Sequence, residues 1–191
     1  MRADCGHHGC VSRRTVVCAA LALAPKLARP ARADDPAAIP PQLGDRFAFL
    51  AGDRRGQVVK LDDLTVDAPQ VQVYPIDPAT GVIRDSSRFN LVMLVRLKPE
   101  ELGGEIRDRA ADGVLAFSGV CTHQSCPVNQ WSSDQHAMVC SCHGSTYDPK
   151  TGAQVIFGPA PRPLPSLGLK IEHGSPVVAA PFDARVGGMR T

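Results

Sequence analysis

The sequence predicts an all-β protein: an antiparallel β body with a turn-rich insertion between residues 118 and 166. Three observations support this fold class. The 191 residues include 17 glycines and 17 prolines, which is typical of many turns between short strands. Aromatic residues make up only 5% of the chain. Hydrophobic residues reach 43%, which is enough for a packed core, and they fall in short runs of strand length.

Short segments with strand patterns follow one another along the body. Residues 56–61 and 71–74 alternate between apolar and polar side chains, whereas residues 91–95 are continuously apolar, as in a buried strand. A further strand leads directly into Cys121, and a hairpin is expected near the C-terminus. The expected strands are residues 56–61, 71–74, 91–95, 114–117, 167–173 and 177–180, with turns at 77–81 and 174–176.

One short helix is expected over residues 98–109. Pro99 stands near its start, where the missing N–H of proline is tolerated, and Glu100 and Glu101 follow in the first turn. These features give the body its one expected helix.

The first 33 residues have the features of an export signal. Arg13 and Arg14 precede an apolar run over residues 16–25, and a small-residue site follows at residues 31–33. This order predicts a twin-arginine signal that is cleaved after residue 33 and delivers the chain to the periplasm. A retained anchor on the periplasmic face of the inner membrane stays open, although a helix of this length spans about half of a bilayer core.

The net charge of +2 arises from that N-terminal segment. The rest of the chain carries 15 basic and 18 acidic side chains, and a mildly acidic body argues against nucleic-acid binding. Residues 34–45 contain three prolines and are expected to form an extended leader before a single domain over residues 46–191.

Two short boxes hold all the cysteines that follow the export segment. The boxes read Cys121-Thr-His123-Gln-Ser-Cys126 and Cys140-Ser-Cys142-His143. Each box offers one cysteine–histidine pair and one additional cysteine. This symmetry predicts a single metal centre between two loops, with two ligands from each loop.

The ligand types fit more than one metal. Two thiolates and two imidazoles satisfy tetrahedral zinc, which would make the chain a zinc-stabilised binding module. They also satisfy a [2Fe–2S] centre in which two histidines replace two cysteines on one iron. A third alternative is a pair of ordinary disulfides, which leaves both histidines unexplained.

Both boxes resemble the cluster-binding motifs of Rieske iron–sulfur proteins. CTHQSC and CSCHGSTYD are similar to the high-potential branch found in cytochrome bc complexes, and residues 158–164 resemble the proline loop of that branch. The resemblance is close over residues 114–165 and absent over residues 62–112. It implies a Rieske-like antiparallel β sandwich over residues 46–191, with one short helix and a cluster-binding subdomain at about 118–166.

The resemblance also implies how the boxes would bind a single [2Fe–2S] cluster per chain. Cys121 and Cys140 would bind the buried iron through sulfur. His123 and His143 would bind the outer iron through a ring nitrogen. The metal ligands expected from the resemblance are therefore these four side chains.

Further residues of the boxes match family positions with supporting roles. Cys126 and Cys142 would form a disulfide that ties the two loops together, which suits an exported protein. The hydroxyl groups of Ser145 and Tyr147 would donate hydrogen bonds to a cluster sulfide and to the Cys121 sulfur. Such donors raise the reduction potential because they stabilise the added negative charge.

The expected function is one-electron transfer without an independent catalytic site. The first interpretation is a periplasmic small subunit or carrier that works with a larger oxidoreductase or a c-type cytochrome, as in arsenite oxidase. The alternative is a membrane-anchored Rieske subunit of a quinol–cytochrome c reductase, in which His143 would contact a quinol. The short apolar run at residues 16–25 and the polar Gln124, where many bc-type proteins carry an apolar residue, favour the first interpretation.

Overall fold

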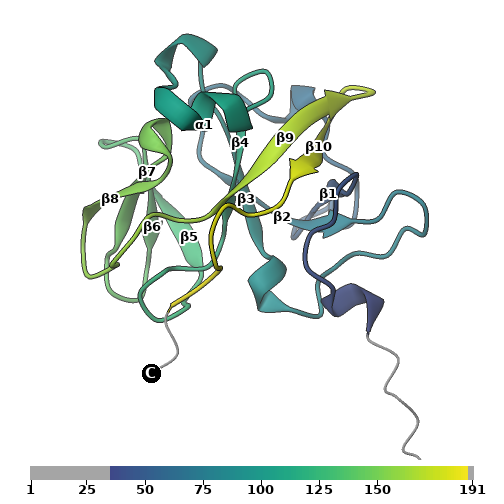
Figure 1. Cartoon of the computed structure of the whole chain (residues 1–191), viewed down its shortest axis with the longest axis horizontal. Helices are drawn as coiled ribbons and strands as arrows, with labels where there is room; N and C mark the ends of the chain where they lie inside the picture. The colour runs from purple at the N-terminus through teal and green to yellow at the C-terminus, as the bar shows by residue number, and fades with distance from the viewer. Residues whose placement is uncertain (1–34, 189–191) are drawn as a thin grey trace, which may run out of the picture. The chain divides into compact units, whose positions relative to one another are not determined.

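The computed structural model describes residues 35–188 (Figure 1). The expected export segment, with Cys5, Cys10 and Cys18, lies outside the described residues. The described part of the chain folds into one six-stranded and one four-stranded antiparallel sheet, with one α-helix. The all-β, antiparallel fold class with one short helix is therefore confirmed.

The two sheets use the chain in separate blocks. The larger sheet has the order β1-β2-β3-β4-β9-β10, with β1 (Arg46–Phe49), β2 (Val71–Ile76), β3 (Val92–Arg96), β4 (Val114–Ser118), β9 (Ser166–Glu172) and β10 (Ser175–Ala180). The smaller sheet lies between β4 and β9 in sequence and consists of β5 (Val128–Ser132), β6 (Ala137–Cys140), β7 (Thr146–Asp148) and β8 (Gln154–Phe157). The helix is α1 (Gly104–Arg109), and 3-10 helices span Pro36–Ala38, Leu61–Asp63, Arg88–Asn90, Pro99–Glu101 and Pro149–Thr151.

The six-stranded sheet curls until its two edges meet. Just before β1, the Gly44 N–H donates to the Val178 carbonyl in β10 at 2.9 Å, and the Val178 N–H donates to the Asp45 carbonyl at 2.9 Å. These bonds make the sheet a nearly closed barrel. Closure pairs backbone groups that an open sheet would leave exposed at its edges.

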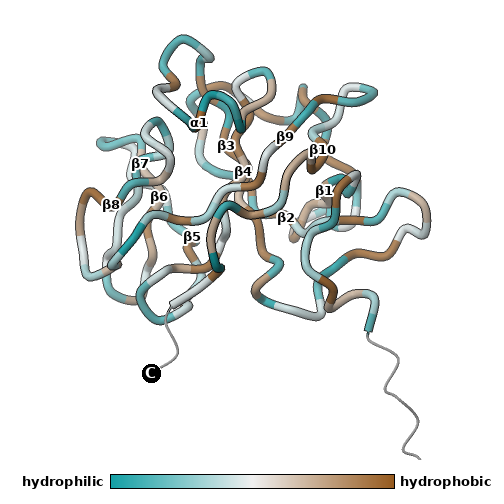
Figure 2. Tube along the Cα trace, viewed as in Figure 1, coloured by the Kyte–Doolittle hydropathy of each residue, from teal (hydrophilic) through white to brown (hydrophobic). Residues whose placement is uncertain are grey.

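Two hydrophobic cores lie on opposite faces of β3 and β4. In β3, Val92 and Leu94 face the interior of the barrel, whereas Met93 and Val95 belong to a second core shared with the smaller sheet and α1. Strand β4 alternates in the same way. Because both faces are buried, these central strands are apolar at successive positions, as Figure 2 shows along the chain.

The predicted strands at 71–74, 91–95 and 114–117 and the C-terminal hairpin are confirmed as β2, β3, β4 and β9–β10. The strand predicted at 56–61 is wrong, because this segment makes one isolated bridge, between Ala48 and Val58. The segment stays hydrogen-bonded to β1 as far as Val59, whose N–H donates to the Phe47 carbonyl at 2.8 Å, and the Leu61 N–H then donates to the Gly174 carbonyl at 2.9 Å.

The single helix predicted over residues 98–109 is divided. A 3-10 turn at Pro99–Glu101 precedes α1, and Leu102 and Gly103 separate them. Gly104 has a φ of +51°, which lies outside the right-handed helical region and marks the break. Among residues 35–188, no helix combines the length and apolar character that a bilayer crossing requires.

A buried ion pair fastens the segment before β1 to the barrel. Arg84 donates from Nε and Nη2 to the two carboxylate oxygens of Asp45, at 2.6 and 3.0 Å, and from Nη1 to the Pro36 carbonyl at 3.2 Å. Asp45 is 2% exposed and Arg84 6% exposed. A pair this deep stabilises the fold only while both partners are present, since either charge alone would be buried without compensation.

Asp45→Ala is expected to lower the free energy of unfolding by about 3–5 kcal/mol, because it leaves the Arg84 charge buried and unpaired. Chemical denaturation of the purified protein measures the change. Asp85→Ala removes the exposed carboxylate next to Arg84 in sequence and is the control, with an unchanged midpoint. An Asp45→Ala variant as stable as the parent would show that the pair does not hold this segment.

Candidate metal centre

The first box forms the loop between β4 and β5, which we call loop 1 (residues 119–127). The Cys121 N–H donates to the Cys126 carbonyl at 2.8 Å, and the Ser125 N–H donates back to the Cys121 carbonyl at 3.0 Å. Ser125 adopts a left-handed conformation with a φ of +59°, which lets the loop reverse tightly. Cys121 is 1% exposed and belongs to the second hydrophobic core.

The second box forms the loop between β6 and β7, which we call loop 2 (residues 141–145). The Cys140 N–H donates to the Ser145 carbonyl at 2.9 Å, and the Gly144 N–H donates to the Cys140 carbonyl at 3.0 Å. The backbone N–H groups of Cys142 and His143 lie close enough to the Cys140 sulfur to lower the pKa of its thiol. Cys140 is 1% exposed and lies in the same core as Cys121.

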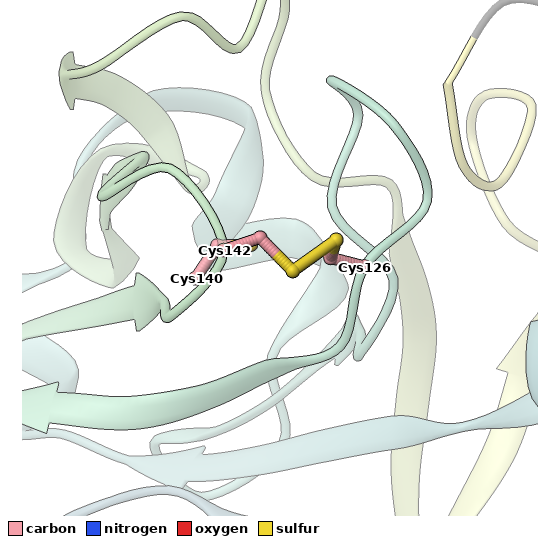
Figure 3. Close-up of side chains that lie close together, drawn as sticks. All are labelled: Cys126, Cys140 and Cys142. Atoms are coloured by element: carbon pink, nitrogen blue, oxygen red, sulfur yellow. A yellow bond between two sulfur atoms is a disulfide. The ribbon is translucent and has the colours of Figure 1, made fainter.

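A disulfide joins the two loops. Cys126 in loop 1 and Cys142 in loop 2 are bonded, with their Cα atoms 6.4 Å apart, and Figure 3 shows the bond crossing between the loops. The sulfur atoms of Cys126, Cys140 and Cys142 lie within 4.8 Å of one another. Since two of these sulfurs are bonded to each other, Cys140 is the one member of this group that offers a free thiol to a metal.

The structure brings the four side chains that the resemblance implied as ligands together in two pairs, one of cysteines and one of histidines. The thiols of Cys121 and Cys140 form no disulfide within the described residues, and Cys121 is close enough to Cys140 to raise the pKa of its thiol. The rings of His123 and His143 meet edge to face, with their centroids 4.8 Å apart. The Nδ1 atom of His123 is buried and has no hydrogen-bond partner among residues 35–188, which suits a nitrogen that faces a metal.

Burial disfavours ionisation of the two thiols unless a nearby positive charge compensates the thiolate. Burial raises the pKa of the Cys140 thiol, the N–H groups donated by Cys142 and His143 oppose this rise, and the neighbouring Cys121 thiol adds to it. Ionising both thiols would place two negative charges side by side in a hydrophobic core. A bound cationic centre removes that penalty, so the donor set fits a metal cluster better than it fits two free thiols.

Tyr147 lies directly behind Cys121. Its side chain is 0% exposed, and its hydroxyl oxygen lies 3.1 Å from the Cys121 sulfur. Burial raises the pKa of the Tyr147 phenol, and the hydrogen bond with Cys121 raises it further, so the hydroxyl keeps its proton. The Thr122 N–H donates to the same oxygen at 3.3 Å, so the Tyr147 proton can point either at the Cys121 sulfur or at the Thr122 hydroxyl oxygen, which is also 3.3 Å away.

Ser145 has a matching arrangement on the other loop. Its hydroxyl oxygen is buried and accepts a hydrogen bond from the Ala160 N–H at 3.2 Å. Because the oxygen already serves as an acceptor, its own proton remains available for donation. Ser145 and Tyr147 therefore both have hydroxyl protons to offer in this region, as the resemblance implied.

A proline-rich segment (residues 158–165) lies against both loops. A Cβ on Gly158 would come within 2.6 Å of the Ser145 Cα, and Gly158 has a φ of +90°, so glycine is needed for this close approach. On loop 1, the Thr122 hydroxyl donates to the Arg162 carbonyl at 2.7 Å. Thr122 was not among the residues expected at the site, although its place between Cys121 and His123 was a usable signal.

One face of the site is open and apolar. His143 is exposed, while Phe157 at the end of β8 is 67% exposed and pairs in register with Thr146. Any side chain at Gly144 would contact the Phe157 ring, so this ring lies beside loop 2. The sequence does not mark Phe157, because its exposure depends on β8 being the edge strand of the smaller sheet.

The other histidines in the described residues do not join the site. His136 is exposed and meets Trp131 edge to face, with the ring centroids 6.5 Å apart. His173 is exposed in the turn between β9 and β10. A cavity of about 510 Å³ lies elsewhere, between α1 and the proline-rich segment, and is lined by neither box.

Comparison with known proteins identifies the family. A family model described as the Rieske [2Fe-2S] domain matches residues 57–168. The cytochrome bc1 complex Rieske iron-sulfur subunit of Streptomyces lividans is 35% identical over 98 residues, which cover 50% of this chain and 58% of that subunit. The subunit of the same name from Mycobacterium tuberculosis is 35% identical over 95 residues, which cover 47% of this chain and 22% of the relative. Each match spans less than two thirds of the relative's length.

A solved structure is also similar. The crystal structure of the plasma membrane Rieske protein from the cyanobacterium Synechocystis PCC 6803 aligns with 25% sequence identity and a TM-score of 0.37. The alignment covers 58% of this chain and 86% of that one.

The family match corrects and settles several expectations from the sequence. The expectation that residues 62–112 do not resemble the family was wrong, because that range lies inside the family match. The range holds β2, β3 and α1 but no motif residue. The alternative of two disulfides is wrong, because the structure pairs Cys126 with Cys142 and leaves the thiols of Cys121 and Cys140 free. A Rieske domain binds a [2Fe–2S] cluster. The family model covers more than half of the sequence, and the chain therefore belongs to the Rieske [2Fe-2S] family.

Proposed function

We propose that this Rieske electron-transfer protein is a subunit of a quinol–cytochrome c reductase of the bc type. The observation that carries the proposal is the pairing of two buried free thiols with two adjoining histidine rings, in a chain whose relatives are Rieske subunits of cytochrome bc1 complexes. This was the alternative interpretation of the sequence. The relatives support it better than a periplasmic small subunit.

The proposed ligands are the four side chains that the two loops bring together. When bound, the [2Fe–2S] cluster supplies the site that takes up and releases one electron. Cys121 and Cys140, each 1% exposed, would hold it from the core side and exclude water there. His123 and His143 would hold it from the outer side, where the neutral imidazoles add no negative charge.

Two hydroxyl groups would tune the potential. Tyr147 is positioned to donate to the Cys121 sulfur, and Ser145 has a proton available on the opposite loop. Reduction adds a negative charge, and donors aimed at that charge stabilise the reduced state more than the oxidised one. We therefore expect a positive reduction potential, in the upper part of the roughly −150 to +300 mV range of Rieske centres.

The open face next to His143 is the proposed point of exchange with partners. His143 is exposed, so its ring would be the shortest protein path between the buried centre and a docked molecule. The exposed Phe157 beside loop 2 would add apolar contact area for a quinol or a partner subunit. In a bc-type complex the His143 ring would accept a hydrogen bond from the quinol and help to remove its proton.

The N-terminal segment determines where in the cell the protein is expected to reside. Twin-arginine export followed by cleavage after residue 33 would give a periplasmic protein, whereas a retained apolar run would anchor the chain on the periplasmic face of the inner membrane. The proposed membership of a membrane complex favours the anchor. A periplasmic small subunit or carrier that delivers electrons to a c-type cytochrome is the competing proposal, supported by the exposed polar Gln124 in loop 1.

Tyr147→Phe is expected to lower the reduction potential, because it removes the hydroxyl donor from the Cys121 sulfur while keeping the buried ring. A hydrogen bond worth about 1–2 kcal/mol corresponds to ~40–90 mV for one electron. Redox titration followed by electron paramagnetic resonance measures the shift. Tyr74→Phe, at the other tyrosine of the chain, is the matched control and should leave the potential unchanged. An equal potential in Tyr147→Phe and the parent would rule out the tuning role.

Affinity purification of the tagged full-length chain from membranes of its own host tests the proposed complex. We expect b- and c-type haem in the purified material, together with a Rieske signal that appears when a quinol is added. An untagged strain is the control for carry-over. Recovery of the chain from the soluble periplasmic fraction, with an oxidoreductase that lacks haem b, would contradict the bc-type proposal and favour the small-subunit alternative.

A further inference from the structure

The segment after β10 runs away from the barrel and ends on the cluster loops. In Figure 1 the yellow chain that follows β10 crosses toward the side that holds the smaller sheet. The last described residues, Gly187 and Gly188, are buried although they lie close to the end of the described chain. A buried terminal segment needs specific contacts that hold it down.

Arg162 of the proline-rich segment provides one set of contacts. Its Nη2 donates to the Arg185 carbonyl at 2.7 Å and to the Gly187 carbonyl at 2.5 Å. Hydrogen bonds from a charged donor are stronger than those between neutral groups. The same residue accepts the Thr122 hydroxyl through its own carbonyl, so Arg162 links the terminal segment to loop 1.

Gly188 makes the second set of contacts, directly on loop 1. Its N–H donates to the Ser125 hydroxyl at 2.8 Å. A Cβ at Gly188 would lie 2.3 Å from the His123 carbonyl oxygen, which is too close for any other residue without displacement. Gly187 is similarly tight, since a Cβ there would lie 2.7 Å from the Ser125 hydroxyl. The terminal backbone therefore lies flat against the backbone of loop 1 at His123.

We propose that residues 185–188 form a strap that fixes the backbone of loop 1 at His123, and that Arg162 is a positioning residue for this histidine. The importance of His123 as a ligand rests on the proposed function, whereas the strap itself rests on the contacts described here. The disulfide at Cys126 holds the far end of loop 1, and the strap holds the part next to His123. Without the strap, that part of the loop would be free to move relative to loop 2.

Hydrogen exchange on the full-length, cluster-containing protein tests the strap. Arg162→Met removes both hydrogen bonds to the strap carbonyls. We expect exchange in peptides over residues 120–127 and 185–191 to rise about tenfold or more, as for the loss of hydrogen bonds from a charged group. Peptides from β4 and β9 should keep the exchange rates of the parent.

Arg185→Met is the matched control. It removes the same charge from an exposed side chain of the strap but leaves the carbonyl that Arg162 binds. We expect the exchange rates of the parent in this variant. In Arg162→Lys we expect a smaller rise in exchange than in Arg162→Met, because lysine keeps the charge but lacks the planar guanidinium. Gly188→Ala, which forces the strap off the His123 carbonyl, should reproduce the effect of Arg162→Met on residues 120–127.

The spectrum of the reduced protein separates positioning from general stability. We expect altered or broadened electron paramagnetic resonance g-values in Arg162→Met and parent-like values in Arg185→Met. Equal exchange and spectra in these two variants, or a rise in exchange spread evenly over all strands, would overturn the strap. If the protein holds no cluster but the local exchange effect is present, the strap stands and the proposed function fails.

Discussion

Two free thiols, Cys121 and Cys140, lie buried near each other in one hydrophobic core, and the surroundings of the site follow from this arrangement. Thiolates are stable at such a depth only if a cationic centre and hydrogen-bond donors compensate their charge. The Tyr147 hydroxyl is placed to donate to Cys121, and nearby backbone N–H groups of loop 2 lower the pKa of the Cys140 thiol. The paired histidine rings complete the set on the outer side, where no thiol is needed. The proposed ligation, by sulfur on the core side and by nitrogen on the outer side, thus matches the change from core to surface.

The scaffold places these groups by giving β3 and β4 two buried faces. One face fills the barrel, and the other forms the core that includes Cys121, Cys140 and Tyr147. Loop 1 begins at the end of β4, so the first box is continuous with the most buried part of the barrel. The disulfide, the proline-rich segment and the strap then hold the loops from separate directions. A stiff site suits electron transfer, since little needs to rearrange when the charge changes.

Sequence patterns predicted the features that are determined by neighbouring residues in the chain. Ligand types and spacing pointed to one centre in two loops, and continuous apolar runs pointed to β3 and β4. The features that were missed depend on distant partners. Residues 56–59 bond to β1 but Leu61 bonds to Gly174, and the positive φ of Gly104 marks the break in the predicted helix. The pairing of Gly188 with Ser125, and the exposure of Phe157 on an edge strand, are set by the tertiary fold and leave no periodic signal.

The central claim is that a single iron–sulfur cluster is held by two cysteines and two histidines from these loops. Pulsed electron paramagnetic resonance of the reduced full-length protein, grown with nitrogen-15-labelled histidine, tests it most directly. The account predicts two distinct histidine nitrogens coupled to the cluster, with one coupling lost in a variant of either His123 or His143 that retains iron. A reduced cluster without histidine coupling, or a chain purified with zinc and no iron, would contradict it.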